Sequence, residues 1–496
     1  MKTHALRLVP TRATARIEPV IDLTIVIGYL VVTLAIGLGQ GKQVDSVHDF
    51  ALGNRHVSTA TLVATLFATG IGGVSTMGVS ERVFSVGIVF LFVFWGEPVN
   101  NLIAGRFLAP RMQRFAGAIS VGDMMHRLYG KPGQLVTGIA GTLKCTGFLG
   151  GQISATGLLL QELLGWPQQV SILVGCSVVI LYSGFGGMRA VTITDVLQFS
   201  ILMLTIPLLL LASVHHAGGW QHLFATVPKS HLTVPPPGES MFPYLALLGV
   251  MSIPFFTPPV TQRLLMAKDG RQARQSLLGT AILGFPFFLM CALIGLAALV
   301  LAKDLPARLA MPHLARVVLP SGIKGCAVVG LLAVIMSTAD SFLHSASIAL
   351  VHDVVRPLWP AGMPDRLELR LTRAATFVLG YGAVLFALLY PTLVDILFAA
   401  FHFWGPVVLP PLIAGIWGVR ASTTAFVAAA AAGIGATLAW SLWGEPTLHV
   451  SALVPGMAAN AAAFWVACVF QPKVCYSISK RQGKCQGGSY AHQTDL

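Results

Sequence analysis

The feature that most constrains this chain is a succession of apolar runs, each long enough to cross a bilayer. About 20 apolar residues in a helix span the hydrocarbon core. The first run, 20–39, is long and is not followed by a small-residue cleavage site, so we interpret it as a retained helix. We count thirteen runs and predict an all-α integral membrane protein with about 13 transmembrane helices. The other twelve lie near 57–79, 83–108, 134–164, 168–186, 190–214, 242–262, 275–302, 325–351, 371–390, 392–418, 422–443 and 448–470.

Composition agrees with a membrane protein and excludes other classes. Hydrophobic residues make up 55% of the chain and charged residues 10%, and the mean hydropathy is +0.76. The net charge of +13 is not gathered into a basic tract with interleaved aromatic residues. Nucleic acid is therefore not the expected partner, and loops that face anionic membrane lipid explain the charge better. We find no nucleophile elbow, phosphate loop or zinc motif, so an enzyme is not expected.

The distribution of Lys and Arg predicts the orientation in the membrane. Thirteen spans place the termini on opposite sides, and most of the 32 Lys and Arg residues face the cytoplasm if the C-terminus does. We therefore predict a multi-pass protein of the plasma membrane (a bacterial inner membrane), with the N-terminus outside. Residues 1–18 form a polar tail outside, and 471–496 form a cytoplasmic tail. The segment 262–274 is interpreted as a basic helix at the membrane interface.

Two predicted spans are interrupted. Gly70, Gly72 and Gly73 weaken the centre of the second span, and prolines interrupt the seventh. The glycines are also compatible with close packing of a continuous helix. The two interrupted spans are five helices apart and run in opposite directions, which predicts inverted repeats around a midplane site. The predicted parts are a peripheral helix at 19–40, repeats at 57–214 and 242–418, and two peripheral helices within 422–470.

A polar stretch lies at the centre of the run 325–351. Ser337, Thr338 and Asp340 fall near the membrane midplane, where an ionisable group needs a partner, a cavity or an ion. The hydroxyls are also compatible with bonds back to their own helix. Backbone carbonyls released around Ala68 and Ile71 lie at a similar depth. Together with the hydroxyls they would offer neutral oxygens to a hard monovalent cation such as Na⁺, whereas softer metals prefer His or Cys.

Three motifs, in this order, resemble those of the solute:sodium symporters over about 21–470. They are D-F-A-L-G-N-R at 49–55, G-G-M-R-A-V-T-I-T-D-V-L-Q at 186–198 and M-S-T-A-D-S at 336–341. The resemblance implies a five-plus-five inverted-repeat core of the leucine-transporter kind. It also implies a role for Asp195 in sodium coupling near the cytoplasmic exit. The implied sodium ligands are the carbonyls of Ala68, Ile71 and Val334 and the hydroxyls of Ser337 and Thr338.

The same resemblance implies a symporter in which sodium entry drives uptake of a small organic solute. Gly70 replaces an aspartate of the bacterial proline permease, and the seventh span lacks the Tyr-Trp and Asn residues of sugar transporters. An amino acid, carboxylate or vitamin is therefore favoured over a sugar. The alternatives are a transport-like sensor without an output domain and, fitting less well, a passive channel. The sequence does not specify the oligomeric state. The candidate solute-binding residues are Gly70, Ser75, Lys144, Phe255 and Asp340.

Two further charges lie deep within predicted spans. Glu97 and Lys144 are each about ten residues from the same end of consecutive antiparallel spans, roughly 15 Å deep. A lone charge at this depth is costly, whereas a buried pair is tolerable. We hypothesise that they form an ion pair, either structural or opened by a charged solute. Alternatively, Lys144 alone binds a solute carboxylate from a cytoplasmic vestibule.

Overall fold

The apolar runs of the sequence form helices in the computed structural model, and no strand occurs in the part it describes. The described residues are 19–41, 44–53, 57–360, 362–389, 404–448 and 451–470. The predicted tails 1–18 and 471–496, and the first part of the predicted span 392–418, lie outside these residues. Helices are the usual structure within a membrane, because a helix forms all its backbone hydrogen bonds internally and no water is present to form them.

The first part of the chain is made of short and interrupted helices. A break separates α3 from α4 at the predicted position, and the two helices are bent by 51°. A π-helix, η1, and a 3-10 helix, η2, then lead to the next long element. The bounds are α1 Pro19–Gly41, α2 Val47–Leu52, α3 Thr59–Gly70, α4 Gly73–Ser85, α5 Val89–Phe94, α6 Gly96–Ile103, η1 Ala104–Leu108 and η2 Ala109–Phe115.

Two very long helical elements follow, and a glycine divides each of them. They are α7, Val121–Leu164, and α8, Gln168–His216. The 49 residues of α8 would extend about 74 Å as one straight helix, more than twice the hydrocarbon thickness. Gly187, at φ 59°, breaks this helix between the two predicted spans 168–186 and 190–214, and Gly130, at φ 71°, breaks α7. Only glycine adopts such backbone angles readily.

The rest of the chain contains the second interruption and the most buried helix. Residues between α11 and α12 leave the helical conformation where the prolines lie. The bounds are α9 Trp220–Thr226, α10 Lys229–Leu232, α11 Phe242–Met251, α12 Pro258–Met266, α13 Gly270–Leu301, η3 Ala307–Leu309, α14 Ala310–Val317, α15 Ile323–Ile348, η4 Ala349–Val355, α16 Arg356–Leu358, α17 Asp365–Leu389, α19 Gly405–Trp417, α20 Thr423–Leu448 and α21 Leu453–Phe470.

Within the described ranges, six helices are long and apolar enough to cross a membrane, and the bent pair α3–α4 makes a seventh. Several other predicted spans coincide with helices that are short or broken, such as α11 and α19. The fold is therefore an all-helical membrane architecture, and the count of thirteen spans stays a prediction.

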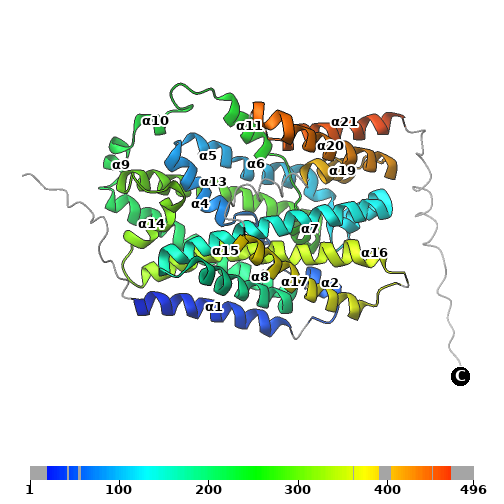
Figure 1. The fold of residues 1–496 in the computed structure, drawn as a ribbon, viewed down its shortest axis with the longest axis horizontal. Coiled ribbons are helices and arrows are strands. Elements are labelled where there is room, and N and C mark those ends of the chain that lie inside the picture. The colour runs from blue at the N-terminus through cyan, green and yellow to red at the C-terminus, as the bar shows by residue number, and fades with distance from the viewer. Residues whose placement is uncertain are drawn as a thin grey trace, which may run out of the picture.

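The helix α15 lies at the centre of the bundle. In its most apolar 18-residue stretch 94% of the residues are buried, against 33% for α1 and 22% for α21. Figure 1 shows α1 along one edge and α20 and α21 near the opposite edge, with α15 between them. Small residues let neighbours approach α15 closely; a Cβ at Gly330 would lie 2.3 Å from Thr205 Oγ1 of α8. The polar stretch of α15 is thus placed inside the bundle.

Candidate functional site

The break between α3 and α4 places helix-terminal backbone groups beside α15. Ile71, which follows α3, has φ −93° and ψ 87°, and Gly72 is extended. The last carbonyls of a helix have no partner within it, so those of α3 are available to other groups. A Cβ at Gly72 would lie only 2.7 Å from Thr338 Oγ1. The glycine therefore allows the broken backbone to contact α15 directly.

Two hydroxyls of α15 meet these carbonyls. Ser337 Oγ lies 2.9 Å from the Ala68 carbonyl oxygen and 3.0 Å from that of Val334. Thr338 Oγ1 lies 3.3 Å and 3.4 Å from the same two oxygens. Each hydroxyl thus bonds both back to its own helix and across to α3. The structure brings four of the five predicted sodium-site residues together. The fifth, Ile71, directly follows α3, the helix that contains Ala68.

The donor set favours a hard cation. Ser337 and Thr338 are at most 1% exposed, and the four oxygens are neutral carbonyl and hydroxyl groups. A bound cation would replace the hydrogen bonds now made by the hydroxyls, and both hydroxyl oxygens would turn lone pairs towards it. Neutral oxygens suit Na⁺, and the set contains neither the nitrogen nor the sulfur that a transition metal prefers.

A second polar cluster contacts α15 one turn beyond Ser337. It contains Asp195, which lies in α8. Its carboxylate forms an ion pair of 2.8 Å with Arg263 of α12, and both side chains are fully buried. Thr65 of α3 donates a hydrogen bond to Asp195 and accepts one of 2.8 Å from Arg263 Nε. The cluster therefore ties α8 to the broken elements of both predicted repeats.

Ser341 connects this cluster to the hydroxyl pair. Its Oγ lies 2.5 Å from Arg263 Nη2 and donates to the carbonyl of Ser337 at 2.7 Å. Asp340, next to it, accepts a hydrogen bond of 2.5 Å from the Tyr182 hydroxyl, and its Oδ1 lies 3.0 Å from Ser341 Oγ. Asp340, predicted as a solute ligand, is thus held among the groups that surround Asp195.

Arg263 corrects the sequence-based interpretation of 262–274 as an interfacial helix. Arg263 is fully buried and lies in α12, whereas Arg271 and Arg274 of α13 are exposed. The sequence did indicate that some buried cation was needed, because an aspartate buried in the membrane, such as Asp195, requires a positively charged partner. The sequence did not reveal that Arg263, 68 residues further on, supplies it.

The remaining solute candidates lie on separate elements: Gly70 ends α3, Ser75 lies in α4, Lys144 in α7 and Phe255 between α11 and α12. Glu97 Oε1 lies 3.2 Å from where a Cβ at Gly70 would be. Lys144 is 1% exposed, and its Nζ lies 5.4 Å from the ring centres of Phe148 and Phe342. Ser75 lies in the first turn of α4 and is partly exposed.

Two more residues border the broken elements. Phe255 lies between α11 and α12, and its carbonyl accepts a 2.8 Å hydrogen bond from Trp404 Nε1. Gln152 of α7 was not singled out from the sequence. It is fully buried, and its Nε2 lies 3.1 Å from the position of a Cβ at Gly72. Neither atom of its amide has a hydrogen-bond partner among the described residues. A buried amide normally has partners, so a solute or a water would satisfy the amide of Gln152.

The predicted ion pair between Glu97 and Lys144 is wrong. The ion pairs found in the described ranges do not join these two residues. Glu97 belongs to α6, which packs on α13, while α7 packs on α15, η4 and α8. The segments η1 and η2 carry the chain away between them, so helices consecutive in sequence need not be neighbours.

Comparisons with known proteins agree with this architecture. The model of the sodium:solute symporter family matches residues 50–433. The osmoregulated proline transporter OpuE of Bacillus subtilis (strain 168) is 23% identical over 463 residues, which cover 89% of this chain and 92% of that protein.

Two solved structures share the fold. A Na⁺-coupled sialic acid symporter, in a substrate-bound outward-open state, has a TM-score of 0.79 and 20% identity, covering 91% of this chain and 98% of its own. Mhp1, a nucleobase-cation-symport-1 family transporter in a closed conformation, has a TM-score of 0.57 and 15% identity, covering 85% of this chain and 95% of its own. The fold is therefore that of known transporters.

Proposed function

The chain belongs to the sodium:solute symporter family, and from this premise we propose that its coupling sodium binds between the α3–α4 break and α15. The observation that carries the proposal is the approach of Ser337 Oγ to the Ala68 carbonyl at 2.9 Å. This contact joins a hydroxyl of one buried helix to the released backbone of another. The proposed ligands are the carbonyls of Ala68, Ile71 and Val334 and the hydroxyls of Ser337 and Thr338.

The protein is thus a sodium-coupled symporter and not an enzyme. An inward sodium gradient drives solute uptake, and the proposed mechanism is alternating access between two inverted repeats. Breaks in α3–α4 and in α11–α12 support it, because half-helices of this kind surround midplane sites in transporters. Sodium bound at Ala68 and Ser337 would hold the α3 end against α15 and so favour one arrangement of the repeats. Its release would remove that constraint.

Asp195 is proposed to act in sodium coupling on the path of the leaving ion. Ser341 supports this role, because its hydroxyl lies one helical turn from Ser337 and contacts the guanidinium that pairs with Asp195. An ion leaving Ser337 would therefore meet Ser341 and Asp195 next. The Arg263 charge would prevent a cation from remaining there, since like charges in a buried site repel.

The proposed solute is a small amino acid, another carboxylate or a vitamin rather than a sugar. Two relatives support a carboxylate on the solute: OpuE is named for proline, and the structural neighbour for sialic acid, an acidic sugar, and both compounds carry that group. Lys144, buried beside Phe148 and Phe342, would provide a cation and apolar rings at one end of such a solute. The other proposed contacts are Gly70, Ser75, Phe255, Asp340 and the amide of Gln152.

Reconstituted uptake tests this function. The purified protein in liposomes should accumulate a labelled amino acid or carboxylate when an inward Na⁺ gradient is imposed. An equal K⁺ gradient should give no accumulation. Accumulation that is the same with either cation would contradict sodium coupling. A panel of amino acids, carboxylates, vitamins and sugars identifies the solute, and uptake of sugars alone would overturn the proposed class.

A further inference from the structure

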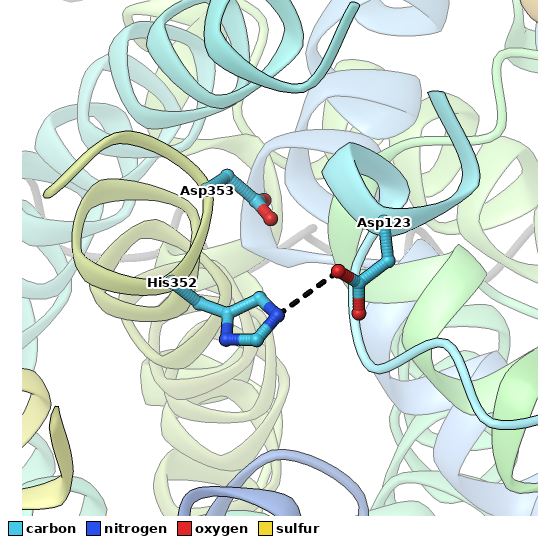
Figure 2. A group of neighbouring side chains, drawn as sticks. All are labelled: Asp123, His352 and Asp353. Atoms are coloured by element: carbon cyan, nitrogen blue, oxygen red, sulfur yellow. Dashed lines mark hydrogen bonds and ion pairs between the residues drawn. The ribbon is translucent and has the colours of Figure 1, made fainter. Parts of the chain in front are cut away.

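A third polar cluster lies away from both the proposed sodium site and the Asp195 cluster, where η4 continues α15 and packs on the first turns of α7. It consists of Asp123, His352, Asp353 and Glu368, which we call the carboxylate–histidine cluster. Asp123 lies in α7, His352 and Asp353 in η4, and Glu368 in α17. Figure 2 shows the side chains of Asp123, His352 and Asp353 converging on one point. Neither the sodium site nor the solute site uses these groups.

The geometry of the three converging side chains suits a metal ion. One carboxylate oxygen of Asp123, one of Asp353 and a ring nitrogen of His352 all lie within 4.8 Å of one another. His352 is 5% exposed and Asp353 2%. Ligand atoms bound to one ion at about 2 Å are separated by about 3–4 Å, so small side-chain movements would complete such a set.

The histidine is oriented as a metal ligand usually is. His352 Nδ1 lies 2.5 Å from Glu368 Oε1, and Nε2 lies 3.0 Å from Asp123 Oδ1. Metal-binding histidines commonly donate their second ring N–H to a carboxylate, which fixes the tautomer. When Nδ1–H donates a hydrogen bond to Glu368, Nε2 carries a lone pair, and this lone pair faces the carboxylate oxygen Oδ1 of Asp123. Either a proton or a cation must lie between them.

The two aspartates are held in place by other groups. Asp123 Oδ2 accepts a 2.9 Å hydrogen bond from the Ile119 backbone, which leaves Oδ1 directed at His352. Asp353 Oδ1 accepts one of 2.6 Å from Ser120 Oγ. Glycines make room for Asp353: a Cβ at Gly122 would lie 2.2 Å from its Cγ, and one at Gly138 would lie 2.6 Å from its Cβ. The backbone of α7 is thus shaped around this carboxylate.

A small cavity lies beside Asp353, lined by both polar and apolar residues. Its volume is about 10 Å³, room for about one water molecule, and Ser120, Thr137 and Asp353 are among its lining residues. Thr137 is 1% exposed, and its hydroxyl has no hydrogen-bond partner among the described residues. Buried hydroxyls normally have a partner, so a water in this cavity, beside Asp353, would satisfy this one.

The charges of the cluster are compatible with a divalent cation when His352 is neutral. Three carboxylates gather here, and the guanidinium of Arg356 lies 3.3 Å from Glu368 Oε2. A divalent cation bound by a neutral His352 would balance the remaining negative charge. A donor set of one imidazole and two carboxylates, without sulfur, suits Zn²⁺, Mn²⁺ or Co²⁺ rather than Cu⁺.

We propose that Asp123, His352 and Asp353 bind a divalent transition-metal cation, with Glu368 as the positioning residue for His352. The ion would join the start of α7 to η4 and so restrain movement of that end of α15. This site is separate from the sodium site and does not depend on the identity of the solute. Its occupation is expected to stabilise the protein and to slow uptake.

Zn²⁺ titration of the purified full-length protein, with any affinity tag removed, tests the proposal. Isothermal calorimetry should detect one saturable site in the wild type. His352→Gln and Asp353→Asn should each weaken it at least tenfold. Glu368→Gln, which keeps all three ligands, should weaken it by roughly 10–100-fold. The matched control is His313→Gln, because His313 faces a single carboxylate, that of Glu162, at 4.0 Å. That variant should bind Zn²⁺ like the wild type.

Co²⁺ provides a second readout that does not require a variant to fold. The wild type loaded with one equivalent should show visible absorption bands of a bound ion, and excess Zn²⁺ should remove them. Failure of the wild type to bind Zn²⁺ or Co²⁺ at micromolar concentration would overturn the proposal. Zn²⁺ binding unchanged in His352→Gln would place the ion elsewhere and would also overturn it.

Discussion

At the residue scale, the proposed sodium site depends on hydroxyls that serve two helices at once. Ser337 and Thr338 bond to Val334 in their own helix and to Ala68 in α3. A hydroxyl used only by its own helix would be compatible with ordinary membrane packing. The bond across to α3 is what distinguishes Ser337 from a serine such as Ser347, which donates only to His344 in its own helix.

Removing either hydroxyl should weaken sodium binding. Ser337→Ala or Thr338→Ala deletes one ligand oxygen, and bonds to charged groups contribute about 1.5–3 kcal/mol. The sodium concentration for half-maximal uptake should therefore rise roughly tenfold or more, which a sodium titration of uptake measures. Ser347→Ala is the matched control and should leave the titration unchanged. A double variant with the sodium dependence of the wild type would remove these hydroxyls from the site.

The buried pair of Asp195 and Arg263 should be energetically coupled. Arg263→Ala leaves a fully buried carboxylate without its cation, which typically costs about 3–5 kcal/mol. Asp195→Asn together with Arg263→Ala should recover part of this loss. The thermal stability of the purified variants measures the coupling, and exposed Arg271→Ala provides a control. Losses in the two single variants that simply add in the double variant would show that the pair is not coupled.

At the element scale, the break between α3 and α4 sets how closely backbone can approach α15. Gly72 does not need an unusual φ, since its angle is −88°, so its requirement is for space alone. A Cβ there would meet Thr338 Oγ1 at 2.7 Å, closer than side chains normally approach. If α3 moved away from Thr338 to relieve this clash, the distances from the Ala68 carbonyl to the two hydroxyls would lengthen.

A methyl group at this position should therefore impair sodium use without unfolding the protein. Gly72→Ala is expected to raise the sodium requirement at least as much as Thr338→Ala, measured by the same titration. The matched control is Gly78→Ala in α4, where the nearest atom to the added Cβ is 4.0 Å away. The control should retain normal uptake. Normal sodium dependence in Gly72→Ala would mean that the break does not shape the site.

Local patterns predicted part of this site. The glycine-rich break follows from residue type, because glycine weakens a helix wherever it occurs. The similar depth of Ala68 and Ser337 follows from their positions in the spans, whereas their pairing in one site was implied by the family resemblance. The partners of the buried charges could not be predicted from the sequence in this way. Asp195 pairs with Arg263 across 68 residues, and Glu97 and Lys144 do not pair although their helices are consecutive. Such pairings depend on which helices pack together, and π-helix and 3-10 segments such as η1 and η2 alter that packing without a clear sequence signal.

At the scale of the whole molecule, orientation follows from charge. The described helices do not carry information on which side of the membrane is cytoplasmic, whereas the positive residues between them do. We expect the C-terminus in the cytoplasm and the N-terminus outside. The carboxylate–histidine cluster, at the end of α15 that leads to 356–373, would then lie towards the cytoplasm.

A reporter fused to the C-terminus checks this orientation. A fluorescent protein that matures only in the cytoplasm should be bright there, while a periplasmic alkaline phosphatase fusion should be inactive. The reverse pattern would contradict the predicted orientation: either thirteen spans run the opposite way, or the number of spans differs from thirteen by an odd number. Matched fusions at 267–269, between α12 and α13 and predicted to be cytoplasmic, would serve as the internal control.

Equilibrium binding of radioactive sodium to the purified protein tests the proposed site between α3 and α15, because it needs neither a known solute nor a membrane potential. The account predicts saturable binding to the wild type that unlabelled Na⁺ displaces and K⁺ does not. Binding should be retained in Ser347→Ala and lost, or weakened by more than tenfold, in the Ser337→Ala and Thr338→Ala double variant. Sodium binding of equal affinity in that double variant would contradict the account.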